Sequence, residues 1–131
     1  MADPFISKGR LIIPRFHRAS FNGKHDRVKA KVYLYLWVHK YQFHQEGGLT
    51  LSEIHWETGV NYNYLRSKAG KWEEWGFVTR RAIIRTRQRP VYSYQIGERG
   101  VHFLRDIMPP DVRRQLTDEI NEWRKNRRLT M

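Results

Sequence analysis

The side chains of this chain that could do chemistry are mostly cationic. Its 131 residues include 25 lysines and arginines against 13 aspartates and glutamates, which gives a formal net charge of +12. The excess is concentrated in two blocks, since residues 1–45 carry nine Lys/Arg against two acids and residues 61–105 carry ten against three. Blocks of one sign attract and steer a polyanion. The sequence therefore indicates a nucleic-acid partner.

Catalysis finds little support among the remaining reactive side chains. None of the six histidines belongs to a His-Glu-x-x-His arrangement, and the chain has no cysteine. Glu73 and Glu74 are adjacent on an expected helix, so they point apart and form a poor acid and base pair. The chain contains no glycine-rich phosphate loop and no nucleophile elbow. We expect a protein that is not an enzyme, with no metal site and no cofactor.

The sequence also limits where the protein is expected to act. No apolar run approaches the roughly 18 to 20 residues that cross a bilayer, and the start MADPFISKGRLIIPRF lacks the continuous apolar stretch of a signal peptide. The lack of cysteine fits a reducing compartment. We therefore expect a soluble, cytoplasmic, nucleoid-associated protein with no membrane partner.

A pair of short helices is predicted between residues 49 and 76. Thr50 and Glu53 have the spacing of a capping box, which begins a helix at the next residue. Gly59 is of the type that ends a helix in the left-handed conformation, and Asn61 can cap a second helix to about residue 75. The spacing of three and four places one set of apolar residues on the inward face of that second helix: Leu65, Ala69 and Trp72.

The elements around this pair follow from periodicity in the same way. They are a basic arm over residues 1–25 with a strand near Leu11, a helix over 26–43, strands over 77–86 and 91–96, and helices over 98–108 and 111–127. The predicted fold class is α+β, mostly α. It has a three-helix core, a two-stranded β wing, the N-terminal basic arm and an additional C-terminal helix.

This order of elements resembles the winged helix-turn-helix domain of prokaryotic transcription regulators, notably the MarR-like and PadR-like groups. Three stretches carry the resemblance: LSEIHWETGVNYNYLRS, KWEEWGFVTRR and YSYQIGERGVHFLRDI. The resemblance implies a DNA-binding domain over residues 26–108. It leaves the arm at 1–25 before the domain and an amphipathic helix at 109–131 after it.

The resemblance also implies that the helix over residues 61–75 lies in the DNA major groove. Asn63 would then make a bidentate contact to adenine and Arg66 to guanine, while its other polar residues hold phosphates. Asn61 could instead serve only as a cap, and Tyr64 could pack inward. The full expected DNA-binding set on this helix is Asn61, Tyr62, Asn63, Tyr64, Arg66, Ser67, Lys68 and Lys71.

The wing over residues 85–90 adds three arginines to this set: Arg85, Arg87 and Arg89. Such residues can contact a narrow minor groove or the backbone phosphates. The alternative is a solvent-exposed loop whose charges serve only solubility.

The C-terminal helix has an apolar stripe made of Val112, Leu116, Ile120 and Trp123. We expect this stripe to make the contact of a homodimer, since many such regulators are two-fold dimers that read two half-sites. The alternative is that it folds back onto its own core.

Together these features predict a sequence-specific double-stranded DNA-binding protein, a transcriptional regulator that acts by occupying an operator. The sequence identifies no small-molecule effector. One alternative is an RNA-binding or ribosome-associated winged-helix protein, which the basic arm and the tyrosines would also suit. A second is a protein-interaction module in a replication or chromatin assembly.

Overall fold

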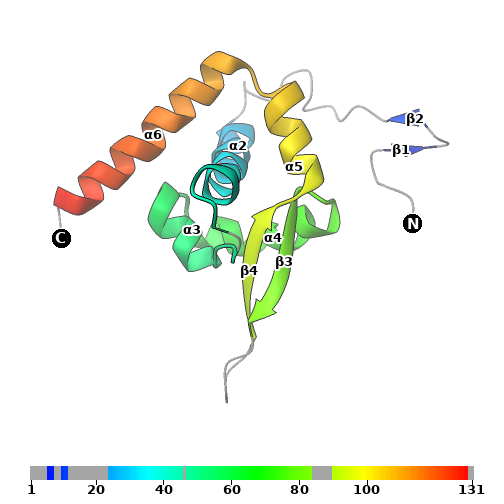
Figure 1. The fold of residues 1–131 in the computed structure, drawn as a ribbon, viewed down its shortest axis with the longest axis horizontal. Helices are drawn as coiled ribbons and strands as arrows, with labels where there is room; N and C mark the ends of the chain where they lie inside the picture. The colour runs from blue at the N-terminus through cyan, green and yellow to red at the C-terminus, as the bar shows by residue number, and fades with distance from the viewer. Residues whose placement is uncertain (1–5, 8–9, 12–23, 46, 84–89, 130–131) are drawn as a thin grey trace.

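Helix α2 (Lys24–Trp37) continues as the π-helical turn η1 (Val38–Gln42) and runs through the middle of the molecule (Figure 1). The computed structural model describes residues 6–7, 10–11, 24–45, 47–83 and 90–129. Within these residues α2 packs against several other helices and against a strand of the larger hairpin. The helix predicted over residues 26–43 is therefore confirmed, and it is the centre of the core.

The described residues form an α+β fold that is mostly helical. After α2 and η1 come α3 (Leu51–Thr58), α4 (Tyr62–Glu74), β3 (Val78–Ile83), β4 (Val91–Ile96), α5 (Glu98–His102), η2 (Phe103–Ile107) and α6 (Pro110–Leu129). Each helix that the sequence predicts between residues 49 and 127 is present. The helix predicted over 98–108 changes from α to π winding partway, at Phe103. The strand predicted over 77–86 is described as far as Ile83.

Strands β3 and β4 form an antiparallel hairpin whose register runs from Val78 opposite Ile96 to Ile83 opposite Val91. Leu49 pairs with Tyr94 on the other edge of β4. The two backbone hydrogen bonds are Leu49 N to Tyr94 O at 2.9 Å and Tyr94 N to Leu49 O at 2.7 Å. The segment that leads into α3 is thus tied to the base of the hairpin.

An aromatic cluster joins α4, the start of the hairpin and η2 to the central helix. Tyr33 of α2 stacks on Phe77 with centroids 5.4 Å apart, and it meets Trp72 and Phe103 edge-on at 5.4 and 5.6 Å. All four rings are buried. Aromatic pairs of this geometry are worth about 0.5–1.5 kcal/mol each beyond the area they bury. The cluster therefore holds α4 and the hairpin in one fixed relation to α2.

Helix α6 packs across α2 and α3 of the same chain, so the prediction that its apolar stripe makes a dimer contact is wrong. Val112, Leu116 and Ile120 are buried in the core, and Leu116 is 0% exposed. Glu119 reinforces the contact through ion pairs to Arg27 at 2.6 Å and Lys31 at 2.8 Å. The prediction assumed that the three-helix core leaves little apolar surface to cover, but α6 covers such a surface on that core. The homodimer itself is untested and stays a prediction.

Two short strands are described in the N-terminal arm, β1 (Ile6–Ser7) and β2 (Arg10–Leu11), which pair antiparallel. The strand predicted near Leu11 is confirmed at that residue, and residues 12–23 lie outside the described part. Along the described stretches, none of the helices has both the length and the apolar character that crossing a lipid bilayer requires.

Candidate nucleic-acid interface

The start of α3 is fixed by the capping box that the sequence predicts. The Thr50 hydroxyl accepts a hydrogen bond from the Glu53 amide at 3.2 Å, and the Glu53 carboxylate accepts one from the Thr50 amide at 2.9 Å. The helix ends at Gly59, whose φ of 76° is left-handed and whose amide donates to His55 O at 2.8 Å. Both predicted ends of α3 are thus confirmed.

Side chains in the last turns of α3 fix the backbone of the turn that leads to α4. The Thr58 hydroxyl donates to Ile54 O at 2.7 Å and accepts from Val60 N at 3.2 Å. His55 Nδ1 lies 2.7 Å from Val60 O, and since a carbonyl oxygen can only accept, Nδ1 carries the proton. These bonds satisfy backbone groups in a turn that could not otherwise be buried.

Helix α4 is anchored by one face and open on the other. Leu65, Ala69 and Trp72 are buried, as predicted, against the core. The expected DNA-binding residues with exposed side chains on α4 are Tyr62, Asn63, Arg66, Ser67, Lys68 and Lys71. Among the described residues, no hydrogen bond or ion pair involves the side chains of Asn63 and Arg66. These two lie three positions apart, so they are neighbours on the helix surface.

Three members of the expected set are engaged within the protein. The Asn61 side chain accepts from Tyr64 N at 3.0 Å and is the cap of α4. Tyr64 is only partly exposed, lies 6.0 Å from the Trp72 ring, and burial raises the pKa of its hydroxyl. The Ser67 hydroxyl donates its proton to Tyr64 O at 2.8 Å. We therefore assign Asn61 and Tyr64 to positioning α4, and the prediction that Tyr64 faces outward is wrong in part.

The two lysines of α4 lie beside aromatic rings while their side chains stay exposed. Lys68 Nζ is 6.0 Å from the Tyr64 ring centroid, and Lys71 Nζ is 5.7 Å from that of Trp75. A cation over a ring face at an exposed site gains about 0.5–1 kcal/mol. The rings thus orient both ammonium groups along the helix.

The β3–β4 hairpin contributes two cations that the sequence analysis did not single out, Arg80 and Arg81. Arg80 stacks on the Tyr92 ring at 4.2 Å and lies 3.9 Å from the Glu73 carboxylate of α4. Arg81 is exposed on the opposite face of β3. Arg80 therefore links the hairpin to α4. Alternation of strand residues could have shown that these arginines lie on opposite faces, but not what either of them contacts.

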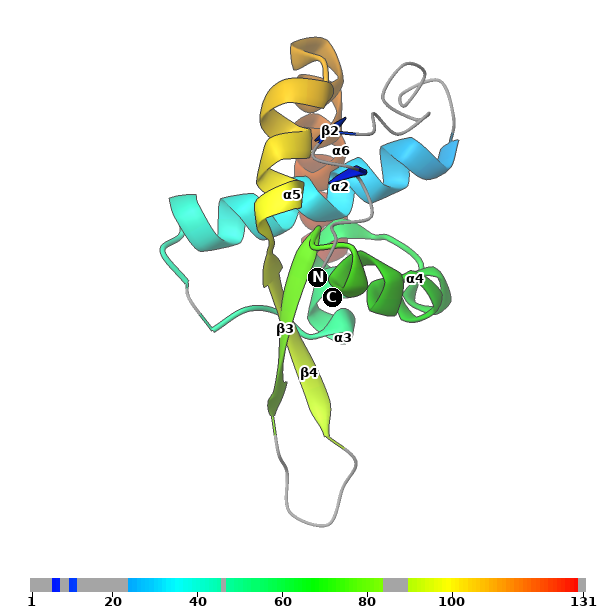
Figure 2. The ribbon, with the colours of Figure 1, turned by 90° about the vertical axis from the view of Figure 1, so that its right-hand side faces the viewer.

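The arginines expected at the wing tip, Arg85, Arg87 and Arg89, lie outside the described residues, so their prediction is untested. The position of the hairpin is described. Figure 2 shows α4 and the hairpin on the same side of α2, with α5 and most of α6 on the other side. The two predicted DNA-contacting elements therefore share one face of the molecule.

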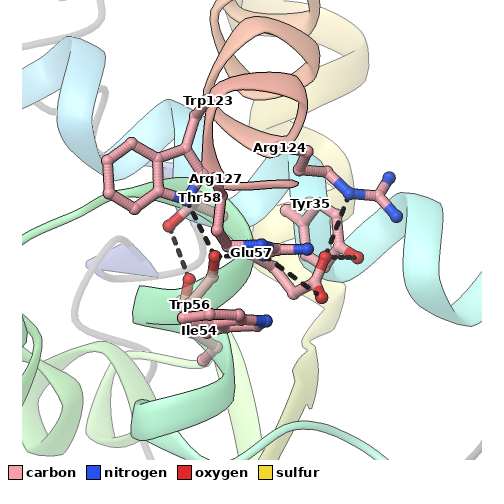
Figure 3. Close-up of polar contacts among 8 residues, drawn as sticks. All are labelled: Tyr35, Ile54, Trp56, Glu57, Thr58, Trp123, Arg124 and Arg127. Atoms are coloured by element: carbon pink, nitrogen blue, oxygen red, sulfur yellow. Dashed lines mark hydrogen bonds and ion pairs between the residues drawn. The ribbon is translucent and has the colours of Figure 1, made fainter. Parts of the chain in front are cut away.

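The C-terminal end of α6 binds α3 beside this face, a contact that the sequence analysis missed (Figure 3). The Glu57 carboxylate accepts from the Tyr35 hydroxyl at 3.0 Å and pairs with Arg124 at 3.1 Å and Arg127 at 3.7 Å. Arg127 also lies over the Trp56 ring at 4.4 Å and donates to Trp56 O. These contacts hold α3 from the side opposite α4, and no local spacing signal points to them.

Comparison with known proteins adds no relative. No family model, no curated protein and no solved structure matches this chain. Within the described residues, no group of three or more histidine or acidic side chains could hold a metal ion.

Proposed function

We propose that this protein binds double-stranded DNA sequence-specifically as a winged-helix transcriptional regulator, with α4 in the major groove and the hairpin against the flanking backbone or minor groove. The arrangement of α2, α3, α4 and the β3–β4 hairpin is compatible with that fold. The major groove is about 12 Å wide, and a helix with its side chains is about 10–12 Å across. A helix anchored on one face, as α4 is, can enter such a groove.

The observation that carries this proposal is the pair Asn63 and Arg66. Both are exposed on α4, and neither side chain is bonded to another described residue. An asparagine can bond to the N6 and N7 edge of adenine, and an arginine to O6 and N7 of guanine. Each such contact is worth about 1–3 kcal/mol of discrimination against a wrong base. Two side chains of these types, both without a partner among the described residues and on one helix surface, favour recognition of bases over DNA binding without sequence preference.

The cations around this pair supply affinity without sequence preference. Lys68 and Lys71 of α4 and Arg81 of the hairpin are exposed. Contacts of lysine and arginine with phosphates release counterions, so affinity falls as salt rises. We assign these residues to the DNA backbone, together with the tip arginines predicted from the sequence.

Selection of bound duplexes from a random pool tests the proposal directly. A recovered consensus of several base pairs supports sequence-specific binding, and a palindromic consensus supports a two-fold dimer. Competition then compares the consensus duplex with a scrambled duplex and with structured RNA of equal length. Equal affinity for all three would contradict sequence-specific binding. Preference for the RNA would support the RNA-binding alternative.

A further inference from the structure

A polar hollow lies on the outer face of the β3–β4 hairpin, beside the segment that leads into α3. Its volume is about 100 Å³. Since roughly 10–15 Å³ of such space is enough for one water molecule, the hollow has room for a polyatomic ion. The described residues that line it are Gly47, Thr79, Arg80, Arg81, Ser93 and Gln95.

The register of the hairpin explains why polar side chains gather here. Thr79 lies opposite Gln95, and Arg81 lies opposite Ser93. Residues two apart on a strand share a face, as do directly opposed residues, so these four side chains stand together. On the inner face, Val78, Tyr94 and Ile96 are buried. The pairing thus gathers Thr79, Arg81, Ser93 and Gln95, which can all donate hydrogen bonds, on one face of the hairpin.

The chemistry of the lining favours an anion. All four outer-face side chains can donate hydrogen bonds, and no carboxylate occurs among the described residues that line the hollow. Arg81 is exposed, and within the described residues its guanidinium makes no hydrogen bond or ion pair. Arg80 is instead committed to Tyr92 and Glu73. Arg81 is therefore the cation available to a ligand.

Ser93 adds a hydroxyl group to the lining of the hollow. The residue is 5% exposed, and no hydrogen bond of its hydroxyl to another described residue occurs. At Gly47, a Cβ atom would meet nothing within 4 Å, so the space beside it is open. The side of the hollow at Gly47 is thus open to a ligand.

We propose that this hollow binds one phosphate group. Arg81 makes the charge-assisted contact, and the hydroxyls of Thr79 and Ser93 and the amide of Gln95 donate to the phosphate oxygens. The group is either a phosphodiester of bound DNA or part of a free phosphate compound. The site does not require that α4 reads bases, so the phosphate titration below can fail or succeed independently of the proposed function.

Titration of the full chain with inorganic phosphate, followed by NMR of backbone amides at constant ionic strength, tests the site. We expect saturable shifts at Thr79, Arg81, Ser93 and Gln95. Arg81→Gln and Ser93→Ala should each weaken phosphate binding about tenfold. Arg81→Gln changes an exposed side chain, so it leaves the test usable if Ser93→Ala fails to fold.

Arg114→Gln is the matched control, because it removes an exposed charge from α6 instead. It should leave the phosphate affinity unchanged. Shifts that do not saturate, or an equal loss of affinity in the Arg114→Gln protein, would overturn the proposal.

The same titration in the presence of duplex DNA distinguishes the two sources of the phosphate group. If DNA supplies it, saturating duplex abolishes the inorganic phosphate shifts, and Arg81→Gln lowers the slope of log affinity against log salt by about one. If a free phosphate compound is the ligand, the shifts persist with duplex bound and the slope is unchanged. Either result supports the hollow as a phosphate site.

Discussion

The indole N–H of Trp123 donates a hydrogen bond to the backbone oxygen of Trp56 at 2.8 Å, and the Trp123 ring lies against Gly59. One residue near the end of the chain therefore contacts both α3 and the turn that begins α4. The position of the proposed recognition helix depends on α6 as well as on its own turn. The first prediction concerns this contact.

Gly59→Ala should destabilise the protein by more than about 1 kcal/mol, because a left-handed position strains any residue with a Cβ. The φ of Gly59 is +76°, and the added Cβ would lie 2.8 Å from Trp123 Cδ2. Urea unfolding measures the loss. A variant as stable as the natural protein would contradict the described contact between Trp123 and the turn.

Gly70→Ala should have the opposite effect on stability. Gly70 lies within α4, and a Cβ atom added there would meet nothing within 4 Å beyond the backbone of its own helix, so alanine causes no clash. An alanine in a helix interior is favoured over glycine by up to about 1 kcal/mol. The spacing places Gly70 on the same outward face as Asn63, so the methyl group should obstruct close approach of a duplex. We expect higher stability with weaker DNA binding; unchanged binding would show that the duplex does not approach α4 at Gly70.

Arg66→Ala should change base preference, whereas Lys68→Ala should weaken every duplex alike. The first removes a proposed contact to guanine, worth about 1–3 kcal/mol of discrimination. The second removes a phosphate contact and lowers the salt slope by about one. Binding of matched and single-mismatch duplexes at several salt concentrations separates the two. Identical effects of both substitutions would defeat the assignment of roles on α4.

Leu116→Ala should reduce the free energy of unfolding by about 2–5 kcal/mol, as expected for a buried leucine that leaves a cavity. Leu116 is 0% exposed within a single chain. The loss should therefore be the same at low and high protein concentration. A loss that grows on dilution would instead indicate that the stripe of α6 contributes to a dimer.

Stability should fall between about pH 10 and pH 12 in part because of Tyr35. Burial, followed by the hydrogen bond to Glu57, raises the pKa of Tyr35 from 10.0 to about 12. A pKa that is higher in the folded protein contributes stability below the unfolded value of 10.0, and this contribution is lost as pH rises through 12. Denaturant unfolding across this pH range measures the loss.

Tyr35→Phe provides the comparison. It should cost about 1 kcal/mol at pH 7 by removing one hydrogen bond, and it should flatten the alkaline decline. The decline should not vanish, because burial also raises the pKa of Tyr33. An identical pH profile in the two proteins would contradict the role of the Tyr35 hydroxyl.

The features that could be predicted from the sequence depend on residues within about four positions of one another. The capping box of Thr50 and Glu53, the left-handed Gly59 and the cap at Asn61 are local in this sense, and all are confirmed. The buried face of α4 follows from helical spacing alone. The assignment to a regulator family depends on resemblance and stays a prediction.

The features that could not be predicted depend on which surfaces meet in three dimensions. The stripe containing Leu116 shows that α6 buries one face, but it does not identify the covering surface. The pairing of Arg81 with Ser93 depends on the hairpin register, which needs the coordinates of both strands. Leu49 joins the sheet through a single bridge, which is too short to give an alternating pattern.

The bridge between Leu49 and Tyr94 also closes a long stretch of the chain into a loop. Its two hydrogen bonds bring together the ends of a segment that holds α3, α4, β3 and the first part of β4. Loss of this bridge would therefore free the segment that leads into α3 from the sheet, although α3 and α4 would keep their own caps.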